Sequence, residues 1–327
     1  MPTDKMSPRI VFFGTPEFAV ASLDRLLVEG YNVVGVVTMP DKTGGRGKRV
    51  IESEVKRYVV GKGLPLLQPV SLKDAAFVEA LRAWRSDLQI VIAFRMLPEV
   101  VWSMPRLGTF NLHASLLPKY RGAAPINWAV INGDSQTGVT TFFLNRDIDT
   151  GDIIMQRAAS IGPEDDAGAV HDRLMALGAD VVVQTVEAIL QGSAQATPQS
   201  ELAADVAPTP APKIFTHTCR VDWDRPAREL HNFVRGLSPH PAAWTELAFA
   251  GGQKTRSKIF KTAPPSDEVS TYFGQMEAWA AEPGTLRADG RRMAVACAGG
   301  EWLEIVELQA EGRKRMGAGE FLRGLRL

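Results

Sequence analysis

The chain has 327 residues, of which 37 are Lys or Arg and 37 are Asp or Glu, so its formal net charge is zero. About 45% of the residues are hydrophobic and 23% are charged, a globular composition that excludes a disordered, collagen-like or mucin-like chain. The length indicates roughly two domains. Zero net charge argues against a molecule wholly dedicated to nucleic acid, although it leaves room for a local basic patch.

Cysteine and histidine usage bounds the chemistry further. The two cysteines, Cys219 and Cys297, are not in a CxxC spacing, and the five histidines form no HxxxH. This pattern argues against a disulfide scaffold and a structural zinc site, so we expect no metal. The first residues lack the apolar segment of a signal peptide, and no stretch approaches the roughly 18 apolar residues of a membrane span. We therefore expect a cytoplasmic protein without a membrane partner.

The first half of the chain alternates strand and helix patterns. A buried-strand pattern at 9–13 ends at Gly14-Thr15-Pro16 and is followed by a helical stretch and a second β-branched run at 31–38. This β-α-β unit favours a parallel sheet. The patterns predict further strands at 88–94, 109–113 and 137–144, and helices at 75–84 and 168–190. We predict an α/β domain with a parallel-rich sheet over residues 1–190.

The composition changes after this domain. Residues 191–213 are rich in Ala, Pro, Ser and Gln, and their Ala-Pro-Thr-Pro-Ala-Pro run predicts a semi-rigid linker. In 214–327 short β patterns are separated by turns such as Asp289-Gly290, which predicts a small β-barrel with one helix near 225–236. Residues 213–327 carry 17 basic and 14 acidic side chains, so this half is mildly basic.

Two polar residues stand at the end of an apolar strand. Asn111 and His113 are two apart, so strand alternation places both side chains on one side. Ligands bind at the carboxyl ends of strands in open α/β sheets. There, an Asn amide can donate to a developing oxyanion and a His can pass protons near neutral pH. The same pattern also fits a capping Asn and a structural His.

Two loops offer further candidates. The segment 147–152 holds three acids without the spacing of an EF-hand, so it is either a solvated turn or the source of a carboxylate that orients His113. The segment 41–49 mixes three glycines with basic residues but matches no Walker loop. It is either a solvated surface loop or an arm for phosphates. Gly14-Thr15-Pro16 is not GxGxxG, which argues against a nicotinamide cofactor.

Together these segments resemble a known family. They are FFGTPEFA (12–19), GRGKR (45–49), NLHASLLPKYRGAAPINWAVINGDSQTGVT (111–140), IDTGD (148–152), APK…VDW (211–223) and LQAEGRKRMGAGEFL (308–322). The set covers almost the whole chain and is similar to the methionyl-tRNA formyltransferase family, one of the 10-formyltetrahydrofolate-dependent formyltransferases. The resemblance implies a Rossmann-like formyltransferase domain followed by an OB-like β-barrel domain that binds tRNA.

The resemblance also implies roles for individual residues. The family's catalytic Asn, His and Asp match Asn111, His113 and Asp149, with Asp149 setting the tautomer of His113. The folate pocket is similar to the stretch Ser115, Leu116, Leu117 and Pro118. The implied reaction moves a formyl group from 10-formyltetrahydrofolate to the α-amino group of initiator methionyl-tRNA. The implied tRNA contacts are Arg46, Lys48, Arg49 and Lys213, and we expect a monomer. A row at Lys254, Arg256, Lys258 and Lys261 is either part of the tRNA surface or an ordinary solvated strand face.

The chain departs from the family pattern at Arg95, where many relatives have a small residue in a loop that should touch the pterin. Relatives also often have a second Lys shortly beyond Lys213. The nearest alternative function is formyl transfer to an amino-sugar nucleotide or another small amine. A non-enzymatic RNA-binding protein is a more distant one.

Overall fold

The computed structural model describes residues 8–44, 49–202, 206–249, 254–277 and 281–325. By its internal contacts the chain forms two compact units. The first contains Met1–Pro125, Thr137–Ala159 and His171–Ala211, and the second contains Ile126–Gln136, Ser160–Val170 and Pro212–Leu327. Each unit has its own sheet and its own core.

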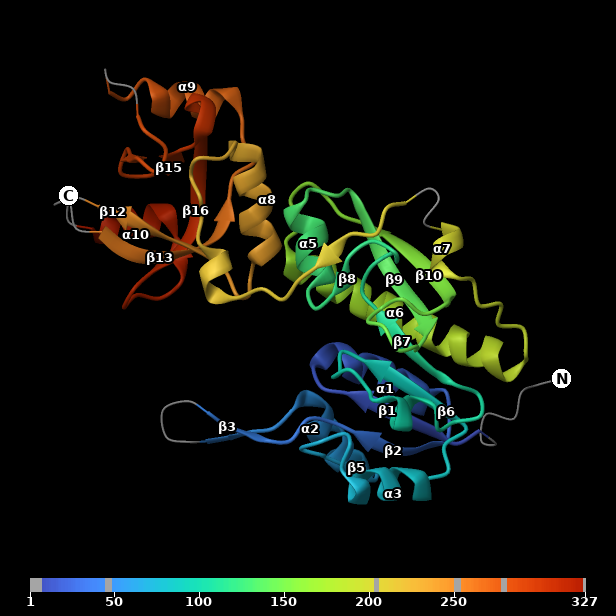
Figure 1. Cartoon of the computed structure of the whole chain (residues 1–327). Helices are drawn as coiled ribbons and strands as arrows, with labels where there is room; N and C mark the ends of the chain where they lie inside the picture. The colour runs from blue at the N-terminus through green and yellow to red at the C-terminus, as the bar shows by residue number, and fades with distance from the viewer. Residues whose placement is uncertain (1–7, 45–48, 203–205, 250–253, 278–280, 326–327) are drawn as a thin grey trace. The chain divides into compact units, whose positions relative to one another are not determined.

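The first unit is built on a seven-stranded sheet with the order β10-β9-β7-β6-β1-β2-β5 (Figure 1). The five strands from β7 to β5 pair in parallel, and β9 is antiparallel to β7. This confirms the predicted parallel-rich sheet. The strands are β1 (Ile10–Gly14), β2 (Val33–Val37), β5 (Leu66–Leu67), β6 (Leu88–Ile92), β7 (Thr109–His113), β9 (Gln136–Phe143) and β10 (Ile153–Ser160).

The central strands bury both faces, as their nearly continuous apolar sequences require. On one face, Val11, Phe13 and Val91 pack against α3 (Ala75–Ala83) and α4 (Glu99–Trp102). The other face meets α6 (Ala167–Leu190), which approaches so closely that a Cβ at Gly178 would lie 2.8 Å from Leu112. Helices α1 (Glu17–Val28) and α2 (Glu54–Lys62) and the short α7 (Gln199–Leu202) complete the helices of this unit.

Two small strand pairs accompany the main sheet. Strands β3 (Lys42–Gly44) and β4 (Arg49–Ile51) form an antiparallel hairpin within the basic segment predicted as a loop. Strand β8 (Arg121–Gly122) pairs in parallel with β11 (Pro210–Ala211). The second pair matters for the site, because it attaches the predicted linker to the segment that follows β7.

The second unit contains an antiparallel sheet, orange and red in Figure 1, with the order β12-β13-β16-β15-β14, and β17 pairs with β16. This curled antiparallel sheet is consistent with the predicted small barrel. Its strands are β12 (Ala243–Ala248), β13 (Lys254–Thr262), β14 (Leu286–Ala288), β15 (Met293–Ala296), β16 (Trp302–Ala310) and β17 (Met316–Gly317). Its remaining elements are α5 (Pro125–Ile131), α8 (Ala227–Leu237), α9 (Asp267–Gly274), α10 (Ala318–Gly324) and two 3₁₀ turns, Thr216–Cys219 and Ala298–Gly300.

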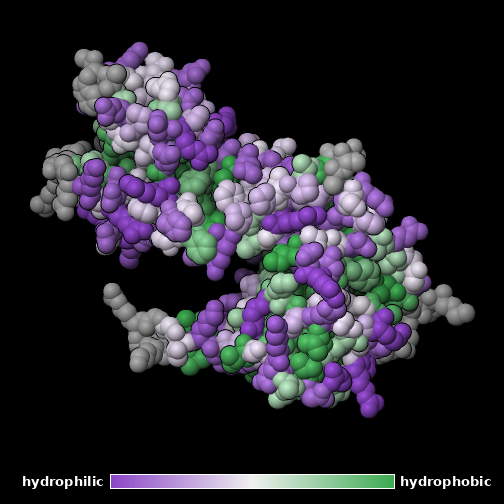
Figure 2. Space-filling model, viewed as in Figure 1, coloured by the Kyte–Doolittle hydropathy of each residue, from purple (hydrophilic) through white to green (hydrophobic). Residues whose placement is uncertain are grey.

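Strand alternation divides the core of the second unit between two faces. Met293 and Val295 of β15 join α8 and α10 in one cluster, whereas Ala294 and Ala296 pack with α9 in another. Hydrophilic side chains cover much of the visible surface of this unit (Figure 2). In the described part of the chain, no helix is both long and apolar enough to cross a membrane.

Candidate active site

Asn111 and His113 project from the last residues of β7 on the same face of the sheet. The register pairs Asn111 with Val91, a residue on the face that packs against α3. His113 is buried, and Asn111 is half-buried. The Oδ1 atom of Asn111 is buried and has no hydrogen-bond partner among the described residues. An unpaired buried polar atom costs about 1–3 kcal/mol, and an orphaned group of this kind calls for a functional explanation.

Both ring nitrogens of His113 face a defined oxygen. The Nε2 atom lies 2.8 Å from the carbonyl oxygen of Tyr120, and Nδ1 lies 3.8 Å from Oδ2 of Asp149. Because a carbonyl can only accept, Nε2 carries a proton and donates it to Tyr120. The Tyr120 carbonyl therefore sets the tautomer, a role that the resemblance assigned to Asp149. Asp149 instead faces the nitrogen that can take up a second proton.

Asp149 is the acid of the segment 147–152 that turns toward the histidine. Its Oδ2 accepts a hydrogen bond of 2.9 Å from the amide of Gly122, whereas Asp147 and Asp152 are exposed. Tyr120 and Asp149 have φ values of +60° and +55°, a region that side chains with a Cβ seldom occupy. Strain of this kind concentrates at functional sites, and here it occurs at both residues that contact the His113 ring.

The stretch from Ser115 to Pro118 forms a buried turn next to His113. Ser115 donates to the carbonyl of Lys119 at 2.6 Å, and the hydroxyl of Thr140 donates to the carbonyl of Ser115 at 2.6 Å. The side chain of Gln156 donates to the carbonyl of Leu117 at 2.8 Å. Ser115, Leu117 and Pro118 are buried and Leu116 is partly exposed. The turn is therefore rigid, and Leu116 is its most accessible side chain.

Arg95, the departure from the family pattern, is bound to a neighbouring loop. Its guanidinium donates to the carbonyls of Pro69 and Val70 at 2.7 and 2.8 Å and lies 5.5 Å from the ring of Phe94. Desolvation lowers the pKa of this guanidinium. The side chain thus connects two loops and is not a free cation.

The predicted tRNA contacts fall in different parts of the chain. Arg46 and Lys48 lie outside the described residues, and Arg49 begins strand β4. Lys213 belongs to the second unit, where its amine lies 5.5 Å from the centre of the Phe215 ring. Phe215 is 50% exposed and stacks on His217 with ring centres 5.7 Å apart. This exposed pair was not among the sequence-based candidates.

Four further residues support the site without having been predicted. They are Tyr120, Gly122, Gln199 and Thr209, which supply backbone or side-chain hydrogen bonds around His113 and Asp149. Tyr120 and Gly122 lie within the motif that carries the resemblance. Gln199 and Thr209 lie in the predicted linker, where composition gave no functional signal.

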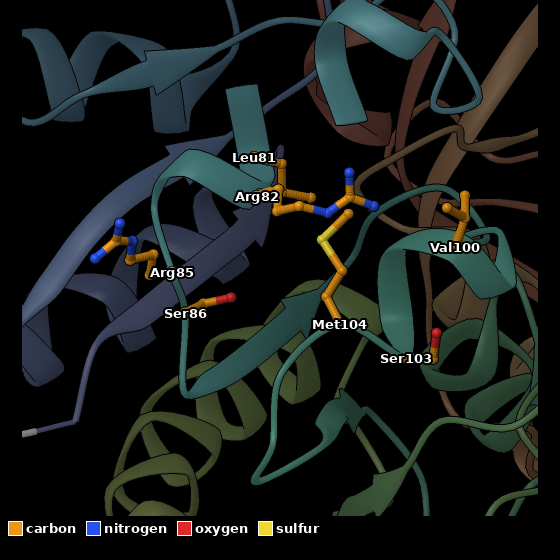
Figure 3. A pocket seen from close by; sticks show the side chains of 7 residues that line it. All are labelled: Leu81, Arg82, Arg85, Ser86, Val100, Ser103 and Met104. Atoms are coloured by element: carbon orange, nitrogen blue, oxygen red, sulfur yellow. The ribbon is translucent and has the colours of Figure 1, made fainter. Parts of the chain in front are cut away.

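A separate pocket lies at the amino ends of β6 and β7, opposite the edge that carries His113 (Figure 3). It contains none of the predicted site residues. It is lined by Leu81, Arg82, Arg85, Ser86, Val100, Ser103 and Met104.

Comparisons with known proteins agree with this architecture. The formyl transferase family matches residues 8–186, and the formyl transferase C-terminal domain family matches residues 213–326. Methionyl-tRNA formyltransferase of Bacteroides fragilis is 52% identical over 319 residues, which cover 98% of this chain and 95% of that protein. The methionyl-tRNA formyltransferase of Parabacteroides distasonis is 54% identical over 320 residues, covering 97% of this chain and 96% of that protein.

Solved structures share the fold at lower identity. HypX from Aquifex aeolicus in complex with tetrahydrofolic acid aligns with a TM-score of 0.62 at 18% identity, covering 96% of this chain and 47% of that one. The N-formyltransferase from Helicobacter canadensis aligns with a TM-score of 0.63 at 17% identity, covering 92% of this chain and 98% of that one. From the family matches and the full-length relatives, this chain belongs to the formyl transferase family, among the methionyl-tRNA formyltransferases.

Proposed function

We propose that this protein transfers the formyl group of 10-formyltetrahydrofolate to the α-amino group of methionine on initiator methionyl-tRNA, giving N-formylmethionyl-tRNA for translation initiation. The observation that carries the proposal is the arrangement of Asn111, His113 and Asp149 in a chain more than half identical to methionyl-tRNA formyltransferases. Tetrahydrofolate bound to a structure of the same fold supports a folate donor.

The folate donor supplies a formyl carbon that an amine can attack. As the bond forms, negative charge develops on the formyl oxygen, and Asn111 can donate an amide hydrogen to it. The unpaired Oδ1 supports this role. Rotation of the Asn111 amide by half a turn would place its NH₂ group, a donor, at the position of Oδ1. Ser115, Leu116, Leu117 and Pro118 would form one wall of the donor site, with Leu116 the most accessible member.

His113 can carry the proton that the attacking amine must lose. Its Nε2 proton is committed to Tyr120, so Nδ1 is the atom that can accept a proton, directly or through water. After uptake, both N–H groups of the imidazolium face an oxygen, one from Tyr120 and one from Asp149. The same proton can then pass to N10 of the leaving folate. No serine or cysteine nucleophile is required.

For the tRNA we propose contacts from Arg46, Lys48 and Arg49 of the basic segment 41–49 and from Lys213 in the second unit. Residues 1–190 would carry the chemistry and residues 214–327 the grip on the tRNA. The exposed Phe215 beside Lys213 supports this, since a cation next to an aromatic face suits a nucleotide chain.

The direct test is to mix the purified protein with 10-formyltetrahydrofolate and either methionyl-tRNA or an amino-sugar nucleotide. We expect formylation of the tRNA-bound methionine only, and formyl transfer to the sugar alone would contradict the proposal.

Replacing His113 by alanine should lower kcat by about 10²–10⁴-fold and leave tRNA affinity nearly unchanged, because the proton acceptor is lost and the tRNA contacts remain. The matched control is His171→Ala, since His171 also lies beside an aspartate, 3.0 Å from Asp172, but on helix α6. If His113→Ala instead abolished tRNA binding, the chemical role of His113 would be wrong.

A further inference from the structure

Gln199 lies in the short helix α7, inside the segment that composition predicts as a linker. Its side chain is 3% exposed, and every hydrogen-bonding position of its amide is used. The Nε2 atom donates to the carbonyls of Asp149 and Gly151, both at 2.9 Å. The Oε1 atom accepts from Nε and Nη2 of Arg121, at 3.1 and 2.5 Å.

These four bonds connect the two segments that contact the His113 ring. Asp149 provides the carboxylate that faces Nδ1, and Arg121 follows directly after Tyr120, whose carbonyl binds Nε2. The side chain of Gln199 therefore bridges the two sides of the imidazole. Because Tyr120 and Asp149 both have a strained backbone, they need surrounding bonds of this kind to hold them in place.

The same segment attaches a second time, ten residues later. The hydroxyl oxygen of Thr209 accepts from the amide of Tyr120 at 2.9 Å, and the Thr209 carbonyl accepts from the amide of Arg121 at 2.9 Å. The parallel pairing of β11 with β8 continues this attachment as far as Gly122, whose amide binds the Asp149 carboxylate. Residues 199 and 209–211 thus bind the two segments that contact the His113 ring.

We propose that Gln199, assisted by Thr209, is a positioning residue that sets the spacing of the Tyr120 carbonyl and the Asp149 carboxylate around His113. The inference rests on the proposed function for its effect on turnover. A glutamine is needed because one planar group must offer two donors and two acceptors. An ionised glutamate would turn acceptor oxygens toward two carbonyls, and asparagine is one methylene shorter.

The test compares Gln199→Met, which keeps the length of the side chain and removes all four bonds, with Gln184→Met. Gln184 is the matched control, since it is exposed on α6 and its Oε1 accepts from the exposed Arg157 at 3.2 Å. For Gln199→Met we expect kcat to fall by about 10²-fold with KM for both substrates within about twofold, because misplaced supports impair chemistry more than binding. For Gln184→Met we expect neither parameter to change.

A second measurement is independent of activity. In protein with ¹⁵N-labelled histidines, the ring signals of His113 should shift in Gln199→Met, while those of the other four histidines stay in place. A merely structural role would lower thermal stability without moving this one ring. If Gln199→Met does not fold, Thr209→Val tests the same idea, because it removes only the acceptor for the Tyr120 amide; a smaller His113 shift is expected.

The outcomes separate the two proposals. Absence of formyl transfer by the unaltered protein would sink the proposed function and leave the His113 shift as the test of positioning. Unchanged His113 signals in both folded variants, or an unchanged kcat for Gln199→Met in an active enzyme, would overturn the positioning role.

Discussion

Two buried histidines show how surroundings decide what one residue type can do. The ring of His113 lies between a carbonyl and a carboxylate, which suit a ring that gains a proton. His231 on α8 instead forms a hydrogen bond of 2.8 Å between its Nδ1 and the hydroxyl of Thr262, and it lies near Arg235 and Arg228. Desolvation, reinforced by these arginines, lowers its pKa to about 4. His231 is therefore a neutral part of the core.

His231 should make the protein sensitive to acid. In the unfolded chain the ring of His231 has the ordinary histidine pKa of 6.5, whereas in the folded protein its pKa is about 4. The contribution of His231 to the free energy of unfolding is therefore complete above pH 6.5 and is lost as the pH falls toward 4, because only the unfolded chain gains the proton in that range. That difference corresponds to about 3 kcal/mol. On acidification from pH 7.5 to 4.5, the free energy of unfolding should fall by about 2 kcal/mol less in His231→Asn than in the unaltered protein. Asparagine can keep the hydrogen bond to Thr262 but does not titrate. Urea unfolding at both pH values measures this. The exposed His217→Asn should behave like the unaltered protein, and an equal effect of the two would refute the assignment.

At the scale of elements, the pairing of β8 with β11 involves only four residues, yet it holds the segment that positions Asp149. Gly122 has a φ of +125°, and a Cβ there would lie 2.6 Å from the carbonyl oxygen of Ala211. Its amide also binds the Asp149 carboxylate. Only glycine allows both this φ and this close approach. The turn at Gly122 therefore depends on Ala211 of the predicted linker, and the position of the proposed catalytic acid Asp149 depends on that turn.

Gly122→Ala should therefore disturb both stability and turnover. We expect a loss of about 1–3 kcal/mol in unfolding free energy from backbone strain, and a fall in kcat of at least about tenfold as Asp149 shifts. Gly30→Ala is the control, since Gly30 has a φ of +79° but nothing within 4 Å of an added Cβ. It should lose about 1–2 kcal/mol with no change in kcat. Equal kcat values for the two variants would show that β8–β11 has no part in turnover.

At the scale of the whole molecule, the zero net charge is a sum of regions of opposite sign. In the second unit Lys254, Arg256, Lys258 and Lys261 are all exposed along β13. Strand alternation explains the first three. Lys261 has the opposite parity, and register shifts beside it in the pairing of β13 with β16 return it to the exposed face. Arg256 also lies 4.0 Å from the ring centre of Trp244, which places a cation and an aromatic ring together.

This row should contribute to tRNA binding if it contacts phosphates. We expect the double variant Lys254→Ala, Lys258→Ala to weaken tRNA binding and to reduce the slope of log K against log salt by about 2, since each phosphate contact adds about 1. Filter binding at several salt concentrations measures the slope. Lys62→Ala, Lys73→Ala is the matched control, because it removes the same charge from exposed positions of the first unit. Identical slopes for the two double variants would make the β13 row an ordinary solvated face.

Local patterns in the sequence were enough to predict much of this protein. Apolar runs predicted five of the seven strands of the first sheet, and short β patterns predicted a small barrel in 214–327, because strand periodicity is a property of neighbouring residues. The motifs from 12–19 to 308–322, taken together, predicted the family. Contacts between distant residues decided the rest. Which of three acids faces His113 and the use of Gln199 and Thr209 in the site depend on pairing between segments 27–89 residues apart. The Tyr120 carbonyl that sets the tautomer is only seven residues from His113, but the amide of Tyr120 is bound by Thr209, 89 residues further along the chain. A segment rich in Ala, Pro and Gln has the same composition whether it is a solvated linker or holds a buried glutamine amide. Only the packing of the folded chain distinguishes the two cases.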